Sequence, residues 1–271
     1  MKPGLFCLCL LLVIISLSCI KDDLSITGKS DGSLISKVKS ADKPYYEYLF
    51  NNENFIIEEK GKYNFTKFSY NDKGQMVASD YYSDEALLSN DMKVLENALN
   101  PVGLIKNISA STESTVNYEY NVNGQLLKTV VSRSLTASSE YSEFRYDENE
   151  RIVRQTLFWD NKVLGYIDYL YDDRGNLIKE TLYSISPAGL AELSTSTRYE
   201  FDNYKNPFRS LSTLMIPGIN TNINNIIKET YTIHYKSGEG TDIVETTLNT
   251  YTYNSKGYPV RKNGTIAYFY E

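Results

Sequence analysis

Short runs of alternating apolar and polar residues fill most of the chain after about residue 44, and turn-forming residues separate them. Side chains two residues apart on a β-strand point to the same face. The stretch YDDRGNLIKETLY, from Tyr171 to Tyr183, is the clearest example, because an acidic pair and a glycine lie between two such runs. The pattern predicts strands joined by tight turns, that is, β-hairpins.

One motif recurs along the chain. It consists of an aromatic residue, any residue, a second aromatic residue and then Asn or Asp, usually with glycine three positions later. The second aromatic residues of the copies are Tyr70, Tyr120, Tyr146, Tyr171, Phe201 and Tyr253. Their spacing fits a unit of about 25 residues, with a degenerate copy inside each of two longer gaps, and such periods indicate a repeat architecture.

The motif predicts a specific turn. The side chain of Asn or Asp can accept a hydrogen bond from the backbone two residues later, and glycine can adopt the positive φ that closes the turn. The predicted turn residues are Asn71, Gly74, Asn121, Gly124, Asp147, Asp172, Gly175, Asp202, Asn254 and Gly257, with Glu150 in the glycine position of the Asp147 turn. A lone hairpin is barely stable, so we expect the hairpins to pair side by side.

One stretch departs from the alternation. Ser83 suits a helix N-cap, and apolar residues follow it at helical spacing until Asn100 and Pro101. We therefore predict one inserted helix near residues 84–98; a longer loop is the alternative. The fold prediction is all-β: an antiparallel meander of hairpins that forms a curled open sheet or partial barrel.

Composition narrows the possible functions. The net charge is −6, so the chain lacks the basic excess that attracts nucleic acid. The three cysteines, Cys7, Cys9 and Cys19, all lie near the N-terminus, which excludes a cysteine nucleophile or cysteine-bound zinc downstream. The 24 tyrosines suit strands with a partly exposed face.

The N-terminus has the pattern of a signal peptide. Lys2 precedes an apolar run from Leu5 to Leu17, which is shorter than the roughly 20 residues of a membrane span. The run ends in Leu17-Ser18-Cys19, which resembles the lipobox of bacterial lipoproteins. The resemblance implies cleavage before Cys19 and its acylation, for example with palmitate. The alternatives are an ordinary signal peptide with a chance cysteine and an N-terminal anchor helix.

Lys21, Asp22 and Asp23 follow the lipobox and look like the export signal of Bacteroidetes surface lipoproteins. This resemblance implies a lipid-anchored protein on the outer face of the cell outer membrane; a simple polar tether is the alternative. The predicted organisation is therefore a signal peptide at 1–18, the lipidated cysteine and a flexible tether at 19–43, and one β-repeat domain at 44–271.

The best copy of the hairpin motif carries a further resemblance. Residues 171–177, YDDRGNL, are similar to the YD repeat, Tyr-Asp-x-x-Gly-x-Leu, of Rhs-type proteins. Only this copy matches every position, which argues against an Rhs toxin-encapsulating shell. Together with the lipobox, the repeats look like the YD-repeat lipoproteins of Bacteroidetes, an uncharacterised family, which implies an antiparallel β-sheet and no established activity.

Candidate chemistry is sparse. The only histidine, His234, lies in an alternating strand without a neighbouring catalytic motif, so we interpret it as a structural or surface residue. Asp172 and Asp173 could bind a metal, but the equivalent turns carry Asn71, Asn121 and Asn254, a mixture that suits turn geometry better. We expect no catalytic residues, no metal and no cofactor.

The sequence therefore favours a non-enzymatic binding or scaffold protein of the cell envelope. Its tyrosine rows could stack on a glycan, pack on an envelope protein or form the apolar layer of the sheet itself. Two alternatives remain open at this stage. One is a periplasm-facing accessory lipoprotein, and the other is a carbohydrate-active hydrolase that uses a pair of the 34 acidic residues.

Overall fold

The computed structural model describes residues 33–41, 43–62, 64–83, 114–133, 136–211, 215–235 and 240–271. The predicted signal peptide, Cys19, the export signal Lys21-Asp22-Asp23 and the predicted helix at 84–98 lie outside these residues. No helix within these ranges is long and apolar enough to cross a membrane.

Seventeen strands and two short 3-10 helices form the described part of the chain. In chain order they are β1 (Ile35–Ser40), β2 (Lys43–Phe50), β3 (Ile56–Gly61), β4 (Asn64–Tyr70), β5 (Met76–Ser83), β6 (Ser114–Tyr120), β7 (Leu126–Arg133), β8 (Thr136–Tyr146), β9 (Ile152–Trp159), β10 (Lys162–Tyr171), β11 (Leu177–Ile185), β12 (Ala191–Lys205), η1 (Pro207–Leu211), η2 (Ile219–Thr221), β13 (Asn224–Ile233), β14 (Ile243–Leu248), β15 (Tyr251–Tyr253), β16 (Pro259–Lys262) and β17 (Ile266–Tyr270).

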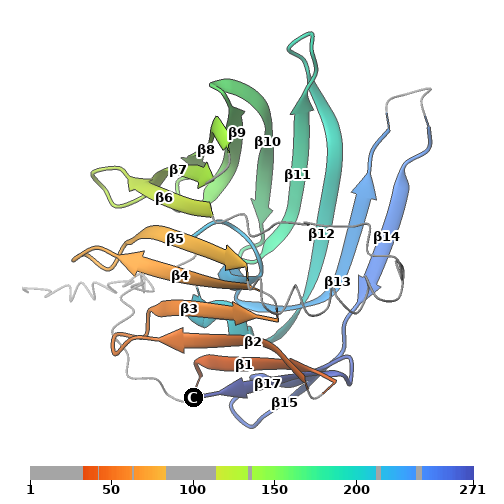
Figure 1. Cartoon of the computed structure of the whole chain (residues 1–271). Coiled ribbons are helices and arrows are strands. Elements are labelled where there is room, and N and C mark those ends of the chain that lie inside the picture. The colour runs from red at the N-terminus through yellow and green to blue at the C-terminus, as the bar shows by residue number, and fades with distance from the viewer. Residues whose placement is uncertain are drawn as a thin grey trace, which may run out of the picture.

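The sheet is an antiparallel meander. Each strand from β1 to β13 pairs with the strand that follows it in the chain. On its other side β1 pairs with β17, and the sheet continues through β16 to β15. The sheet curls strongly but stays open, with β14 and β15 as its outer strands (Figure 1). The predicted fold class, a curled open antiparallel meander of hairpins, is therefore confirmed.

The predicted start of the domain at residue 44 was wrong. Strand β1 already lies between β2 and β17, and its residues Ile35 and Val38 are buried in the core. The boundary was missed because the polar residues around β1 resemble a tether. Burial of its apolar residues against the C-terminal strand makes this segment part of the sheet.

Two apolar clusters lie on the inner face of the curled sheet. The first contains Ile35, Val38, Tyr48, Ile56, Leu211 and Tyr268, and the second contains Leu126, Phe144, Ile152, Tyr169 and Leu177. The segment between β12 and β13, which we call the insertion (residues 206–223), contributes to both. Leu211 belongs to the first cluster, and Ile216 packs against the second. The described residues of the insertion therefore contact both apolar clusters.

Candidate functional site

The predicted turn residues form one repeated structure. The Asn71 side-chain oxygen accepts hydrogen bonds from the backbone N–H groups of Lys73 and Gln75, both at 3.0 Å. The same pair of bonds recurs at Asn121, Asp147, Asp172 and Asn254. The glycines that close these turns have positive φ: 73° at Gly74, 82° at Gly124, 92° at Gly175 and 82° at Gly257.

Two turns achieve this geometry without glycine. Glu150 has a φ of 60°, so an L-residue occupies the left-handed region where the other copies use glycine. Asn54, with a φ of 65°, closes a further turn that begins at Asn51. This copy of the motif was not predicted from the sequence, although Tyr48-Leu49-Phe50-Asn51 carries the same aromatic and Asn spacing.

The two acidic residues of the hairpin at 171–183, Asp172 and Asp173, have different roles. Asp173 is exposed, whereas Asp172 holds its turn. Burial disfavours ionisation of Asp172, but hydrogen bonds from Asn176 and Arg174 outweigh it, so the pKa of Asp172 lies below its usual value. Asp172 is thus engaged in shaping the backbone.

Tyrosine hydroxyls connect successive hairpins. In four copies of the motif, the second tyrosine donates a hydrogen bond to the carbonyl of the apolar residue that begins the return strand of the preceding hairpin. Tyr251, the first aromatic residue of its copy, and Tyr270 of β17 make the same kind of bond to a backbone carbonyl. The pairs, at 2.5 to 3.0 Å, are Tyr70–Ile56, Tyr120–Met76, Tyr146–Leu126, Tyr171–Ile152, Tyr251–Ile226 and Tyr270–Pro259. Burial raises the pKa of Tyr146 to about 12, so this hydroxyl keeps its proton at physiological pH.

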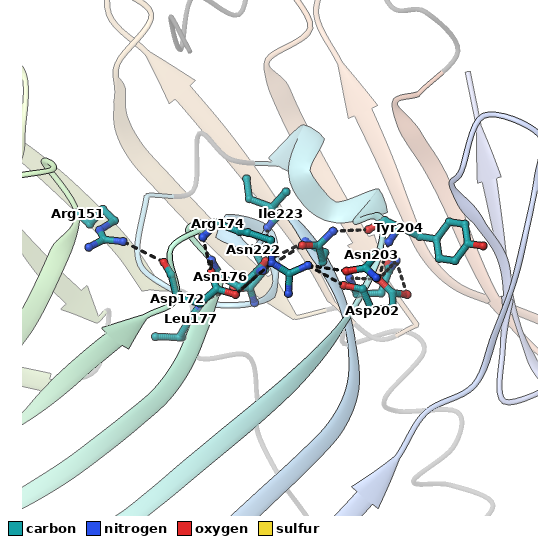
Figure 2. Close-up of polar contacts among 12 residues, drawn as sticks. Arg151, Asp172, Arg174, Asn176, Leu177, Asp202, Asn203, Tyr204, Asn222 and Ile223 are labelled. Atoms are coloured by element: carbon teal, nitrogen blue, oxygen red, sulfur yellow. Dashed lines mark hydrogen bonds and ion pairs between the residues drawn. The ribbon is translucent and has the colours of Figure 1, made fainter. Parts of the chain in front are cut away.

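A buried polar cluster lies where the insertion meets the best hairpin (Figure 2). We call Asn176, Asn222 and Asn224 the asparagine cluster, and they are 0%, 1% and 7% exposed. The Asn176 amide donates to Asp172 and to Asn224, each at 3.0 Å. Its oxygen accepts from the N–H groups of Ile223 and Asn224, at 2.9 and 3.0 Å. The cluster therefore ties the insertion to the Asp172 turn.

Further polar contacts hold the beginning of the insertion. Asp202 accepts hydrogen bonds from Tyr204, Asn225 and the Tyr253 hydroxyl. Arg174 donates to Asn203 at 2.7 Å. The predicted turn at Asp202 was wrong: Asp202 lies within β12, which continues to Lys205 with an irregular register, because its side chain is engaged by Tyr204 and Asn225 and no return strand follows at once. The chain enters the insertion after Lys205. Among buried side-chain polar atoms of the described residues, only the Ser83 hydroxyl has no partner.

His234 lies in an arrangement that the sequence did not predict. Its Nε2 lies 2.8 Å from the Ser196 hydroxyl, and its Nδ1 lies 2.7 Å from the Asp242 carboxylate. This is the order of contacts in a Ser-His-Asp hydrolase. Hydrogen bonds from the Tyr235 N–H and from His234 lower the pKa of Asp242. The contact was missed because residues 196 and 234 meet only through the β12–β13 pairing.

The position of Ser196 favours a structural role for these contacts. Ser196 lies inside β12, pairs with Thr181 on one side and Thr232 on the other, and is 8% exposed. Its backbone groups face neighbouring strands, whereas acyl transfer needs donors aimed at a developing oxyanion. The arrangement instead attaches the start of β14 to β12, in keeping with the structural interpretation of His234.

In the part of the chain that the structure describes, no three His, Cys, Asp or Glu side chains lie together in a way that could hold a metal ion. The predictions of no metal and no cofactor are not tested by this and stay predictions.

No protein-family model and no curated protein matches the sequence. Among solved structures, a porin-like protein from Bacteroides uniformis is 12% identical, with 88% of this chain and 98% of that chain covered and a TM-score of 0.38. A protein of unknown function from Bacteroides fragilis is 12% identical, with 68% and 91% covered and a TM-score of 0.25. The structure of TcdB2-TccC3 is 13% identical, with 84% and 11% covered and a TM-score of 0.31. Similarity at this level assigns neither a family nor a function.

Proposed function

We propose that this chain is an outer-membrane lipoprotein, lipidated at Cys19, that acts as a non-enzymatic binding or scaffold protein on the cell surface. The observation that carries the scaffold role is the use of its polar side chains. The turn residues Asp147 and Asp172, the asparagine cluster and His234 all hold backbone segments together. These polar side chains, which are the candidates for catalysis, thus make hydrogen bonds that stabilise a large open sheet.

The anchor rests on the lipobox and can be tested with a matched control. Cys19→Ala should abolish incorporation of radiolabelled palmitate and leave the precursor uncleaved. Cys9→Ala, which alters a cysteine inside the predicted signal peptide, should leave labelling unchanged. A Cys19→Ala chain that is still labelled and processed would contradict the anchor.

The surface location rests on the three charged residues after Cys19. Proteinase added to intact cells should degrade the wild-type protein. A variant with Lys21, Asp22 and Asp23 all changed to Ala should still carry palmitate but resist the proteinase. Resistance of the wild-type protein would instead support the periplasm-facing alternative.

The aromatic side chains on the outer face of the sheet indicate which class of partner the protein binds. Tyr141 and Tyr166 each lie three residues from a buried aromatic residue of the same strand, so they point away from the core. The Tyr141 ring stacks on Phe158 at 4.4 Å, with the Lys128 ammonium 4.0 Å from the Tyr141 ring. The Tyr166 ring stacks in the same way on Tyr183, at 4.8 Å, and Arg154 lies 3.9 Å from it.

These contacts cover ring faces that a sugar would need for stacking, so they favour an envelope protein over a glycan as the partner. A glycan array probed with the full-length protein should therefore give no binding that depends on these rings. Binding that is lost in a Phe158→Ala, Tyr183→Ala double variant would reverse the choice of partner.

A further inference from the structure

Strand β14 is the exposed end of the sheet (Figure 1). Among the described strands it pairs with β13 alone, and all six of its residues are exposed. Its apolar residues Ile243, Val244 and Leu248 are 52%, 60% and 67% exposed. The other outer strand is better covered, because Tyr253 of β15 stacks on Tyr204 of β12 at 3.9 Å.

The pairing with β13 shows which backbone groups of β14 face away from the sheet. The N–H of Asn249 donates to the carbonyl of Ile227 at 2.8 Å. Hydrogen-bonded and non-hydrogen-bonded pairs alternate along an antiparallel ladder. Residues 243, 245 and 247 therefore direct their N–H and C=O groups to β13, whereas Val244, Thr246 and Leu248 direct theirs outward.

Within the residues that the structure describes, this edge lacks the usual protection against pairing. Natural edge strands carry Pro, Lys, a bulge or a covering segment. Strand β14, IVETTL, has no Pro or Lys, and its register with β13 is continuous. Its one charged residue, Glu245, has its backbone groups directed at β13. The outward groups of Val244, Thr246 and Leu248 form a regular template for another strand.

We propose that the occupant is a second copy of this chain, which pairs β14 to β14 in antiparallel fashion about a two-fold axis at Thr246. Thr246 then faces Thr246 of the second copy, and Val244 faces Leu248 in both directions. Every outward N–H can meet an outward C=O, and two apolar pairs flank the axis.

Charge selects this register. With the axis at Thr246, each Glu245 lies opposite Thr247 of the second copy. An axis at Glu245 would instead place two carboxylates directly opposite each other, which is destabilising. The pairing uses the outward edge of β14 in each of the two copies. No outward β14 edge is then left for a third copy, so the assembly closes as a dimer and does not extend into a fibre.

The register can be tested by charge design at the two exposed positions. In a Val244→Lys, Leu248→Lys variant, the axis at Thr246 brings like charges together, and dimerisation should weaken at least about tenfold. In a Val244→Lys, Leu248→Glu variant the same register pairs opposite charges, so the dimer should persist and weaken with added salt. Sedimentation equilibrium of the full-length protein in density-matched detergent measures the mass. Circular dichroism should show equal strand content in all three proteins.

A cysteine placed on the axis gives an independent test. Cα atoms of a hydrogen-bonded antiparallel pair lie about 5.5 Å apart, within the range for a disulfide. Thr246→Cys should therefore yield a disulfide-linked dimer under oxidising conditions. Thr247→Cys, which directs its side chain to the other face, should give no more than the wild-type background from Cys7, Cys9 and Cys19. A monomeric wild-type protein, equal dimerisation of the two charge variants, or equal cross-linking at 246 and 247 would overturn the proposal.

Discussion

Replacing Asn176 should reveal how strongly the asparagine cluster holds the insertion. The Asn176→Ala variant loses the oxygen that accepts from the N–H groups of Ile223 and Asn224. Asn176 is fully buried and Asn224 is 7% exposed, so bulk water does not solvate the two donors, and at most a single trapped water can replace the lost oxygen. Each buried donor left without an acceptor costs roughly 1–3 kcal/mol.

Two such donors imply a loss in the free energy of unfolding of roughly 2–6 kcal/mol. We expect about 3 kcal/mol, because a water molecule in the space left by the side chain restores part of the bonding. With a urea dependence of about 3 kcal/mol per molar for a protein of this size, the unfolding midpoint should fall by about 1 M urea.

The matched control is Gln125→Ala, which alters the same repeat position in the Asn121 turn. Gln125 accepts one side-chain hydrogen bond, from Asn121 at 2.9 Å. Its loss should cost under about 1 kcal/mol because that turn is partly exposed. Urea unfolding followed by circular dichroism and tyrosine fluorescence gives both values. If Asn176→Ala costs no more than Gln125→Ala, the cluster does not hold the insertion and the reasoning fails.

Three further predictions concern the repeat. Glu150→Gly should stabilise the protein by about 0.5–1 kcal/mol in urea unfolding, because glycine tolerates the φ of 60° that strains glutamate. Tyr171→Phe should lower the free energy of unfolding by about 1 kcal/mol in the same assay, since it removes the 2.7 Å hydrogen bond to the Ile152 carbonyl. An unchanged free energy of unfolding would show that the tyrosine hydroxyl bonds between hairpins are dispensable. The pKa of Asp172 is lower in the folded state, so its contribution to stability is present above the unfolded pKa of about 3.9 and is lost as the pH falls. Acid titration should show a shallower loss below about pH 4 in Asp172→Asn, and an unchanged acid profile would contradict this assignment.

The hairpins could be predicted from the sequence because their determinants are local. Asn71 and Gly74, for example, lie three residues apart and define their turn without help from other elements. The turn that Asn54 closes was missed although Tyr48-Leu49-Phe50-Asn51 carries the local spacing, because Asn54 stands where most other copies have glycine. Long-range contacts left no such signal. Nothing near Asn176 indicates that it bonds to Asn224, 48 residues away.

The contacts of His234 with Ser196 and Asp242 could not be predicted from the local sequence either. Alternation placed His234 in a strand, but its neighbours depend on which strand lies beside β13 and in which register. Strand β1 was assigned to a tether because its burial depends on β17, at the other end of the chain. Turn chemistry can therefore be read from a window of a few residues, whereas the polar contacts of the candidate site require the whole topology.

The pairing of β1 with β17 has a consequence for the order of folding. Ile35 pairs with Tyr270 and is completely buried, so the first strand, which can pair early with β2, acquires its second neighbour only after residues 266–270 have been synthesised. Hairpins in between can form early because their contacts are local, but the first apolar cluster stays incomplete until the last strand arrives. Contacts of such long sequence separation slow folding. Ribosome-bound chains that stop before Ile266 should therefore expose Ile35 to protease, and release of the last five to six residues should be the step that makes the N-terminal half resistant.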